Sequence, residues 1–155
     1  IEVSNIAAEK AKKHISNIST KPLKRDSYEE EFFDVVFSYH VIEHINDPIS
    51  FIEDINHIMK THGKLVIGTV NFDCAMARRF GENFRLLHDK THISLFSDFS
   101  LKDLLEDSGF QVDYIDYPFF ETEYFTKENL NRVFDTSEVS PAFYGNFMTI
   151  YATKK

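Results

Sequence analysis

The sequence predicts an α/β fold built on a mostly parallel sheet. Two apolar runs, F-D-V-V-F at 33–37 and K-L-V-I-G-T-V at 64–70, have the continuous apolar character of buried strands. The stretch between them carries one helical stripe of apolar residues: Phe51, Ile52, Ile55, Ile58 and Met59. Buried strands that alternate with amphipathic helices are typical of βαβ units, and 155 residues suggest a single domain over 1–155.

Capping signals place the helices of the first half. Ser4 can cap a helix over 5–14. Asp47-Pro48 supplies an N-cap and a first-turn proline for the helix that carries the apolar stripe. We expect Gly63 to end that helix as the residue after its C-cap.

The second half of the sequence predicts shorter helices and strands. Ser100 and Asp103 resemble a capping box for a helix that stops at Gly109. Between the two halves, about 72–99, lies a polar and aromatic stretch that begins with a short helix at 73–80. The remaining predictions are a strand at 110–117, a helix at 126–134 and a final strand at 145–153.

Composition excludes some classes of partner. The net charge of −8 argues against a nucleic-acid or anionic-membrane surface, because both need a basic patch. A single cysteine, Cys74, cannot form a disulfide within the chain, which favours a reducing compartment and hence the cytoplasm. No apolar run reaches the length of a membrane span, and charges interrupt the apolar residues of the N-terminus, unlike a signal peptide.

The segment H-V-I-E-H at 40–44 matches the metal-hydrolase pattern H-x-x-E-H. That pattern needs both histidines on one face of a long helix. Here a strand ends three residues before His40 and Pro48 follows four residues after His44, so a metal hydrolase is the least favoured reading. Ser38, Tyr39 and His40 instead lie at the carboxyl end of a buried strand, where open α/β sheets bind ligands.

Four segments in order resemble class I S-adenosylmethionine-dependent methyltransferases, closest to the group that includes the ubiquinone-pathway O-methyltransferases. They are F-D-V-V-F-S-Y-H-V-I-E-H-I-N-D-P, then G-K-L-V-I-G-T-V-N, then H-D-K-T-H-I-S-L-F-S-D-F-S-L-K-D-L-L-E-D-S-G-F-Q-V, and last P-A-F-Y-G-N-F-M-T-I-Y-A-T-K-K. The resemblance covers about 32–155. It implies a Rossmann-like sheet with a C-terminal antiparallel strand, a lid-like insertion at about 72–99, and S-adenosylmethionine as cofactor.

The sequence departs from this family at its start. The glycine-rich turn G-x-G-x-G that should follow the first strand is missing, and no glycine precedes Gly63. The resemblance therefore implies an N-terminally truncated domain. In the family's strand order, 3-2-1-4-5-7-6, loss of strand 1 leaves the strand at 33–37 with an open edge. We expect the displaced N-terminus or a second copy of the chain to cover that edge, the latter giving a homo-oligomer.

The resemblance also implies roles for single residues. Glu2 matches the acid that binds the ribose hydroxyls, and Ser38, Tyr39 and His40 would complete the cofactor contacts. His44 would be the general base; its alternative is a buried, hydrogen-bonded histidine. The residues expected to contact the methyl acceptor are Asn71, His88, His92 and Tyr144, with Arg78 and Arg79 as further candidates for an acidic acceptor.

The segment 40–44 also resembles a magnesium site, although one ligand does not match. Ubiquinone-type O-methyltransferases bind Mg²⁺ through the pattern acid-x-x-E-H, but His40 stands where the first acid should be. Mg²⁺ prefers oxygen ligands, so we expect no metal there.

The function predicted is methyl transfer from S-adenosylmethionine to a small-molecule acceptor, with O-methylation favoured and with activity impaired by the missing strands. The alternative is a catalytically silent interaction module that pairs through the open edge. The sequence does not identify the acceptor.

Overall fold

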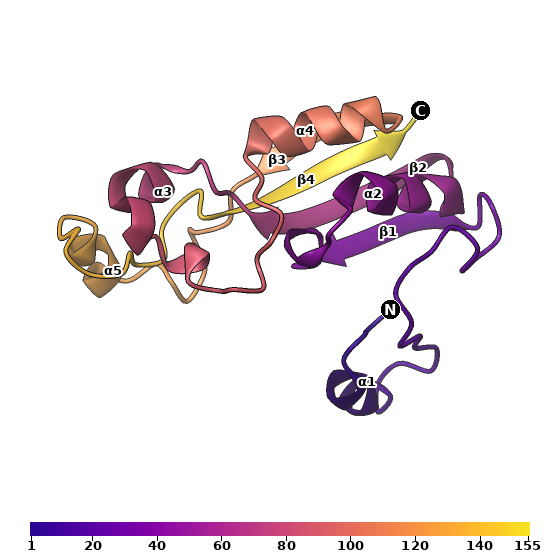
Figure 1. Ribbon diagram of the computed structural model, residues 1–155, viewed down its shortest axis with the longest axis horizontal. Helices are drawn as coiled ribbons and strands as arrows, with labels where there is room; N and C mark the ends of the chain where they lie inside the picture. Colours follow the sequence, from indigo (N-terminus) through magenta and orange to yellow (C-terminus); the bar gives the residue numbers. More distant parts are fainter.

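The computed structural model describes all residues, 1–155, and contains one four-stranded sheet. Across the sheet the strands run β1 (Phe33–Tyr39), β2 (Met59–Val70), β4 (Phe147–Lys154) and β3 (Phe110–Asp116), as Figure 1 shows. β1 and β2 are parallel, whereas β4 is antiparallel to both β2 and β3. This arrangement confirms the α/β fold and reproduces the family order 4-5-7-6, including the antiparallel C-terminal strand.

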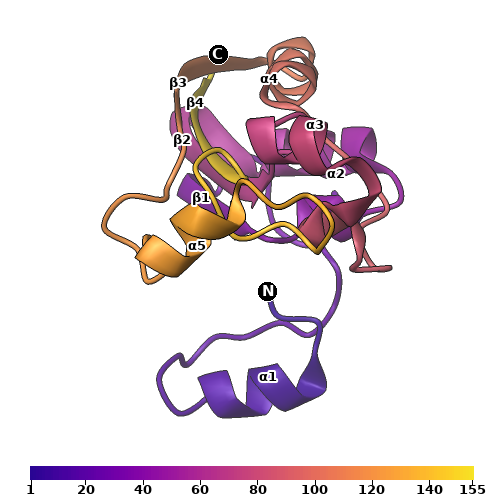
Figure 2. The same ribbon diagram turned by 90° about the vertical axis from the view of Figure 1, so that its left-hand side faces the viewer.

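Two helices cover one face of the sheet, α2 (Pro48–Ile58) and α4 (Asp98–Asp107) (Figure 2). The core lies between them and the strands, and includes Ile52, Ile55, Leu65, Ile67, Leu101, Leu105 and Ile150, all at most 1% exposed. Side chains alternate along β1, so Val35, Phe37 and Tyr39 point to the opposite face and are exposed. The predicted apolar stripe of α2 is therefore the face that builds the core.

Local capping explains where the other helices begin. Ser4 accepts a hydrogen bond from the amide of Ala7 and caps α1 (Asn5–Ala11). Asp47 caps α2 through the amide of Ser50, with Pro48 in the first turn, as predicted. Cys74 caps α3 (Ala75–Phe80), and Thr126 caps α5 (Lys127–Arg132).

The prediction that Gly63 ends α2 is wrong. The helix ends at Ile58 and β2 begins at the next residue, so Gly63 lies inside the strand. The residue in the left-handed region is His62, with φ 66°. Gly63 is needed for a close approach instead, because a Cβ there would lie 2.8 Å from the carbonyl oxygen of Lys60 and 3.1 Å from that of Asp34.

The predicted capping box is displaced by three residues. Ser97, not Ser100, is the N-cap of α4: its hydroxyl accepts from the amide of Ser100, and the hydroxyl of Ser100 accepts from the amide of Ser97. A serine replaces the usual Glu or Gln, which is why the pattern misplaced the start. Gly109, with φ 87°, follows the helix end as expected.

Strand β1 forms one edge of the sheet, since only β2 pairs with it. The N-terminal segment does not add a strand beside β1. Both views show α1 lying apart from the sheet (Figures 1 and 2). The expectation that the displaced N-terminus covers this edge is therefore wrong, and a second copy of the chain stays a prediction. None of the helices has both the length and the apolar character that crossing a membrane requires.

We expect Gly63→Ala to destabilise the fold by roughly 2–3 kcal/mol, because the new methyl group would meet two backbone carbonyls that can separate only by distorting the start of β2. Thr20→Ala, at an exposed position outside the helices and strands, is the control and should change stability by less than about 0.5 kcal/mol. Urea denaturation measures both, and a loss for Gly63→Ala no larger than that of Thr20→Ala would contradict the close-approach argument.

Candidate functional site

The candidate site lies at the carboxyl ends of β1 and β2, where a cavity of about 220 Å³ opens. Tyr39 and His40 line it from the end of β1, so the structure brings these two predicted cofactor residues together. The other lining residues include Thr69 of β2, Phe147 and Thr149 of β4, and Tyr124 from the segment that follows β3. This is the end of a parallel pair at which α/β sheets bind ligands.

A left-handed turn at His40, with φ 51°, ends β1 and aims the chain into the 3₁₀ turn η1 (Ile42–His44). The amide of His40 still donates to the carbonyl of Gly68, which keeps the turn against β2. The Tyr39 ring lies on Gly68, where a Cβ would be only 2.3 Å from a ring carbon. The His40 ring packs edge-on against Phe147 at 5.3 Å between centroids. Glycine at 68 therefore makes room for one wall of the cavity.

Ser38 is separated from this wall. It alternates to the helix-covered face of β1, where it is buried, and its hydroxyl has no hydrogen-bond partner. It does not line the cavity with Tyr39 and His40. A role for Ser38 in cofactor binding stays a prediction.

A hydrogen-bonded chain joins the partly exposed His40 to the buried Glu43 and Thr69. Glu43 is 1% exposed; His40 Nδ1 lies 3.0 Å from its Oε1, and the Thr69 hydroxyl donates to its Oε2 at 2.8 Å. Burial acts to raise the pKa of Glu43, but the hydrogen bonds from His40, the backbone and Thr69 outweigh burial and hold that pKa below its usual value. Glu43 therefore serves as a fixed buried carboxylate.

This chain does not suit Mg²⁺. An imidazole stands where the pattern needs an acid, and it hydrogen-bonds the one carboxylate that remains. Mg²⁺ requires near-octahedral oxygen ligands, which these three side chains do not supply. The helix that the hydrolase pattern requires is absent as well, since His40 is left-handed and η1 spans only three residues.

The side chains of His44 and His92 lie beside each other because the loop at 91–94 is hydrogen-bonded to η1. The backbone carbonyl of Glu43 accepts from the amides of Ile93 and Ser94, which fixes the loop against η1. Their rings lie 5.1 Å apart between centroids. His44 is exposed and donates from Nδ1 to the carbonyl of Thr91 at 2.9 Å, so the alternative of a buried histidine does not hold.

The hydrogen bonds of both histidines determine their tautomers. A carbonyl can only accept, so Nδ1 of His44 carries the hydrogen and Nε2 presents a lone pair in the neutral ring. His92, with a side chain 9% exposed, bonds the carbonyl of Leu86 through Nδ1 at 2.7 Å in the same way. His44 therefore has an exposed basic nitrogen, which a general base requires.

Four residues that were predicted to bind cofactor or acceptor lie away from the cavity and from the His44–His92 pair. Glu2 accepts from the amide of Ser4 in the N-terminal segment, and Asn71 accepts from the amide of Asp73 in a local turn. His88 is exposed and bonds the carbonyl of Glu82, while Tyr144 packs beside the Tyr117 and Phe120 rings. None of the four lines the cavity, and their predicted contacts remain predictions.

Arg85 is a further candidate residue beside the cavity, and no pattern in the sequence predicts it. Its guanidinium lies 6.0 Å from the Tyr124 ring and 5.9 Å from the Phe147 ring, and both rings line the cavity. Its Nη1 is buried and has no hydrogen-bond partner. The two arginines named as candidates are already engaged, Arg78 with the Asp73 carboxylate and Arg79 with the carbonyl of Val133. Sequence offers no signal that separates Arg85 from them.

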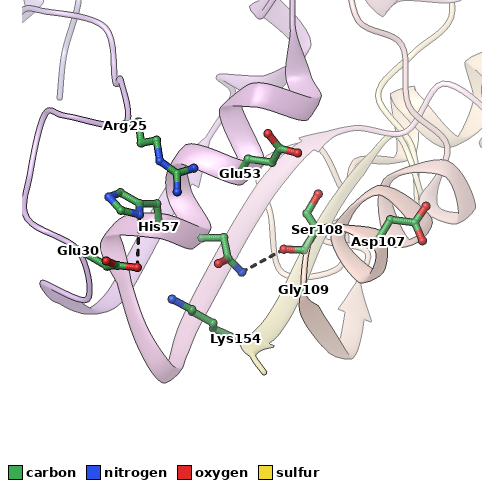
Figure 3. A pocket seen from close by; sticks show the side chains of 9 residues that line it. Arg25, Glu30, Glu53, His57, Asp107, Ser108, Gly109 and Lys154 are labelled. Atoms are coloured by element: carbon green, nitrogen blue, oxygen red, sulfur yellow. Dashed lines mark hydrogen bonds and ion pairs between the residues drawn. The ribbon is translucent and has the colours of Figure 1, made fainter.

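A second, larger cavity of about 500 Å³ lies at the opposite end of the sheet, before β1 and β2 begin (Figure 3). Charges of both signs line it: Arg25, His57 and Lys154 with Glu30, Glu53 and Asp107. The most buried cation among them, Lys154, already donates to the carbonyl of Met59. We assign no chemistry to this cavity.

Comparison with known proteins identifies the family. A family model described as a methyltransferase domain matches residues 1–115, most of the chain. The chain belongs to this methyltransferase family. The matched part includes β1, β2, Tyr39 and His40, whereas β4 and the cavity residues Tyr124, Phe147 and Thr149 lie beyond it.

Solved methyltransferases share the fold. A S-adenosylmethionine-dependent methyltransferase from Thermotoga maritima, described as a possible histamine N-methyltransferase, is 24% identical and superposes with a TM-score of 0.71 over 99% of this chain and 72% of its own. One from Archaeoglobus fulgidus is 17% identical, with a TM-score of 0.69 over 99% of this chain and 74% of its own.

A curated relative is longer than this methyltransferase chain. An uncharacterised protein from Methanocaldococcus jannaschii is 29% identical over 111 residues, which cover 72% of this chain and 43% of the relative. The chain thus spans less than half the length of the curated relative it matches.

Proposed function

We propose that this methyltransferase chain takes part in transfer of a methyl group from S-adenosylmethionine to a small-molecule acceptor, with a hydroxyl oxygen as the favoured acceptor atom. The observation that carries the proposal is the exposed His44, whose Nδ1 hydrogen is used by the carbonyl of Thr91, so that the neutral ring presents Nε2 as its proton acceptor. An acceptor hydroxyl must lose a proton when it is methylated, and a fixed neutral imidazole is suited to take it. The proposed compartment is the cytoplasm.

Tyr39 and His40 would hold the cofactor, which supplies an electrophilic methyl group when bound. The cavity of about 220 Å³ is smaller than the range of about 300–1,000 Å³ usual for small-molecule sites, so these residues fit the cofactor as one wall of a larger site. Glu2 and Ser38 are proposed as further contacts from the family resemblance.

Arg85, beside the cavity, favours an acceptor with a negatively charged group. Its Nη1 is buried without a hydrogen-bond partner, which is unfavourable, and an acidic acceptor would supply one. Asn71, His88, His92 and Tyr144 are proposed as additional acceptor contacts. We therefore expect a hydroxylated carboxylic acid to be a better acceptor than its neutral ester.

Calorimetric titration with S-adenosylhomocysteine, the product of the cofactor, tests the proposal directly. We expect binding with a dissociation constant in the micromolar range, and Tyr39→Ala should weaken it because the ring forms one wall of the cavity. His14→Gln, an exposed change after α1, is the control and should bind as the parent does. Failure of the parent chain to bind would remove support for catalysis by this chain.

One observation favours a second function, a catalytically silent module that associates through β1. That strand has a free edge, and its outward face exposes Val35 (45%) and Phe37 (67%). A free apolar edge pairs readily with another strand, and a second copy of the chain is the partner we propose. The titration separates the two functions: absence of cofactor-product binding together with a stable dimer in light scattering would favour the silent module.

A further inference from the structure

Glu43, His44 and His92 form a cluster that neither the sequence analysis nor the proposed function uses as a unit. One ligand atom from each lies within 4.8 Å of the others. His92 is 48 positions from His44, and the cluster exists because the loop at 91–94 is bonded to η1. The hydroxyl of Ser94 adds a further bond, to the carbonyl of Ile45.

The two imidazoles are oriented as metal ligands. Each donates its Nδ1 hydrogen to a backbone carbonyl, that of Thr91 for His44 and that of Leu86 for His92. Such bonds fix the ring and leave Nε2 as the donor atom, which is the usual arrangement around histidines that bind metals. Glu43 keeps a lone pair for a metal, because the hydrogen bonds from His40, Thr69 and the backbone use three of the about four lone-pair sites of a carboxylate.

A second carboxylate completes the donor set. Asp89 Oδ2 lies 3.7 Å from His92 Nε2, too far for a hydrogen bond. Its other oxygen, Oδ1, is held by the amide and hydroxyl of Thr91. Oδ2 of Asp89 and Nε2 of His92 therefore face each other with no hydrogen bond between them, and a cation placed there would contact both.

We propose that Glu43, His44 and His92, with Asp89 as a fourth ligand, bind a divalent transition metal such as Zn²⁺. Two nitrogen and two carboxylate ligands suit four-coordinate zinc, whereas Mg²⁺ requires more oxygen. Neighbouring ligands on zinc lie roughly 3.4 Å apart at bond lengths near 2.1 Å, so distances of up to 4.8 Å must close by up to about 1.4 Å. His44 can make that movement because it is exposed on a three-residue turn.

A bound metal would hold the lid-like segment against the end of β1. It would also exclude the role of His44 as a general base. The nitrogen of His44 that binds the metal is the same Nε2 that the proposed function uses as a base. A bound metal therefore blocks proton transfer at His44. Metal binding itself does not rest on methyl transfer, so the two proposals can fail separately.

Calorimetric titration of the chelator-stripped chain with ZnCl₂ tests the site. We expect one Zn²⁺ per chain, a dissociation constant in the micromolar range or tighter, and no binding of MgCl₂. His44→Gln and His92→Gln should each weaken binding at least about tenfold. His88→Gln, an exposed histidine of the same segment outside the cluster, should bind as the parent does.

A thermal-melting measurement guards against a folding defect. Zinc should raise the melting temperature of the parent and of His88→Gln, and should not raise that of His44→Gln, whose exposed side chain can change without disturbing the core. The proposal is overturned if the parent binds no zinc, or if both cluster variants bind it as tightly as the parent.

Discussion

Replacing His44 with Gln should lower the rate of methyl transfer by roughly 10²–10⁴-fold, the range that a lost general base accounts for. The amide of Gln can still donate to the carbonyl of Thr91, so the local fold should persist while the basic nitrogen is lost. Affinity for S-adenosylhomocysteine should stay unchanged, because His44 does not line the cavity beside Tyr39. The assay follows single-turnover methyl transfer to phenolic and hydroxylated carboxylic acids, with a chelator present to keep metal off His44.

The dependence of the same reaction on acceptor concentration separates catalysis from positioning. Loss of a general base lowers the rate at saturating acceptor, whereas loss of a contact that only holds the acceptor raises the acceptor concentration needed for half the maximal rate. We expect His44→Gln to show the first effect, and His14→Gln, exposed and remote from the site, to keep the parent rate. If His44→Gln retains the parent rate, the base lies elsewhere and this part of the mechanism is wrong.

The elements that sequence predicted well are those set by local rules. The stripe of α2 and the apolar run of β2 follow from periodicity, and Asp47 with Pro48 marks the helix start by hydrogen bonding that lies within four residues. Gly63 was misread because a glycine after a helix usually relieves a left-handed residue. Here it allows the backbone of β2 to approach the carbonyl of Asp34 in β1, a contact between distant residues.

The site was also predictable only in part, because some of its contacts join residues that are distant in the sequence. Tyr39 and His40 follow from the rule that ligands bind at the carboxyl ends of strands. The meeting of His92 with Glu43 depends on backbone bonds from Ile93 and Ser94, and no spacing in the sequence encodes them. Arg85 differs from Arg78 and Arg79 in its position over two aromatic rings and in its unpaired Nη1, and both features require three-dimensional structure.

Removing the buried carboxylate of Glu43 should have the largest effect on stability. Glu43→Ala leaves the buried Thr69 hydroxyl without its acceptor, frees His40 from its partner and opens a void, and should lower the free energy of unfolding by about 3 kcal/mol. Glu43→Gln keeps the shape and one acceptor oxygen, so about 1 kcal/mol is expected. Glu53→Ala, an exposed glutamate on α2, should change stability by less than about 0.5 kcal/mol.

The stability lost when Glu43 is replaced should be smaller in acid than at neutral pH. The pKa of Glu43 in the folded chain lies below its ordinary value of 4.5, so the carboxylate stabilises the fold above that value, and its contribution disappears as the pH falls through the lowered pKa. Glu43→Gln lacks this contribution, so the stability difference between parent and variant should stay constant from pH 7 to about 5 and shrink as the pH falls below 4.5 and through the lowered pKa. Urea denaturation with a chelator present measures both proteins across that range. A difference that stays constant or grows in acid would show that the ionised form of Glu43 is not what His40 and Thr69 stabilise.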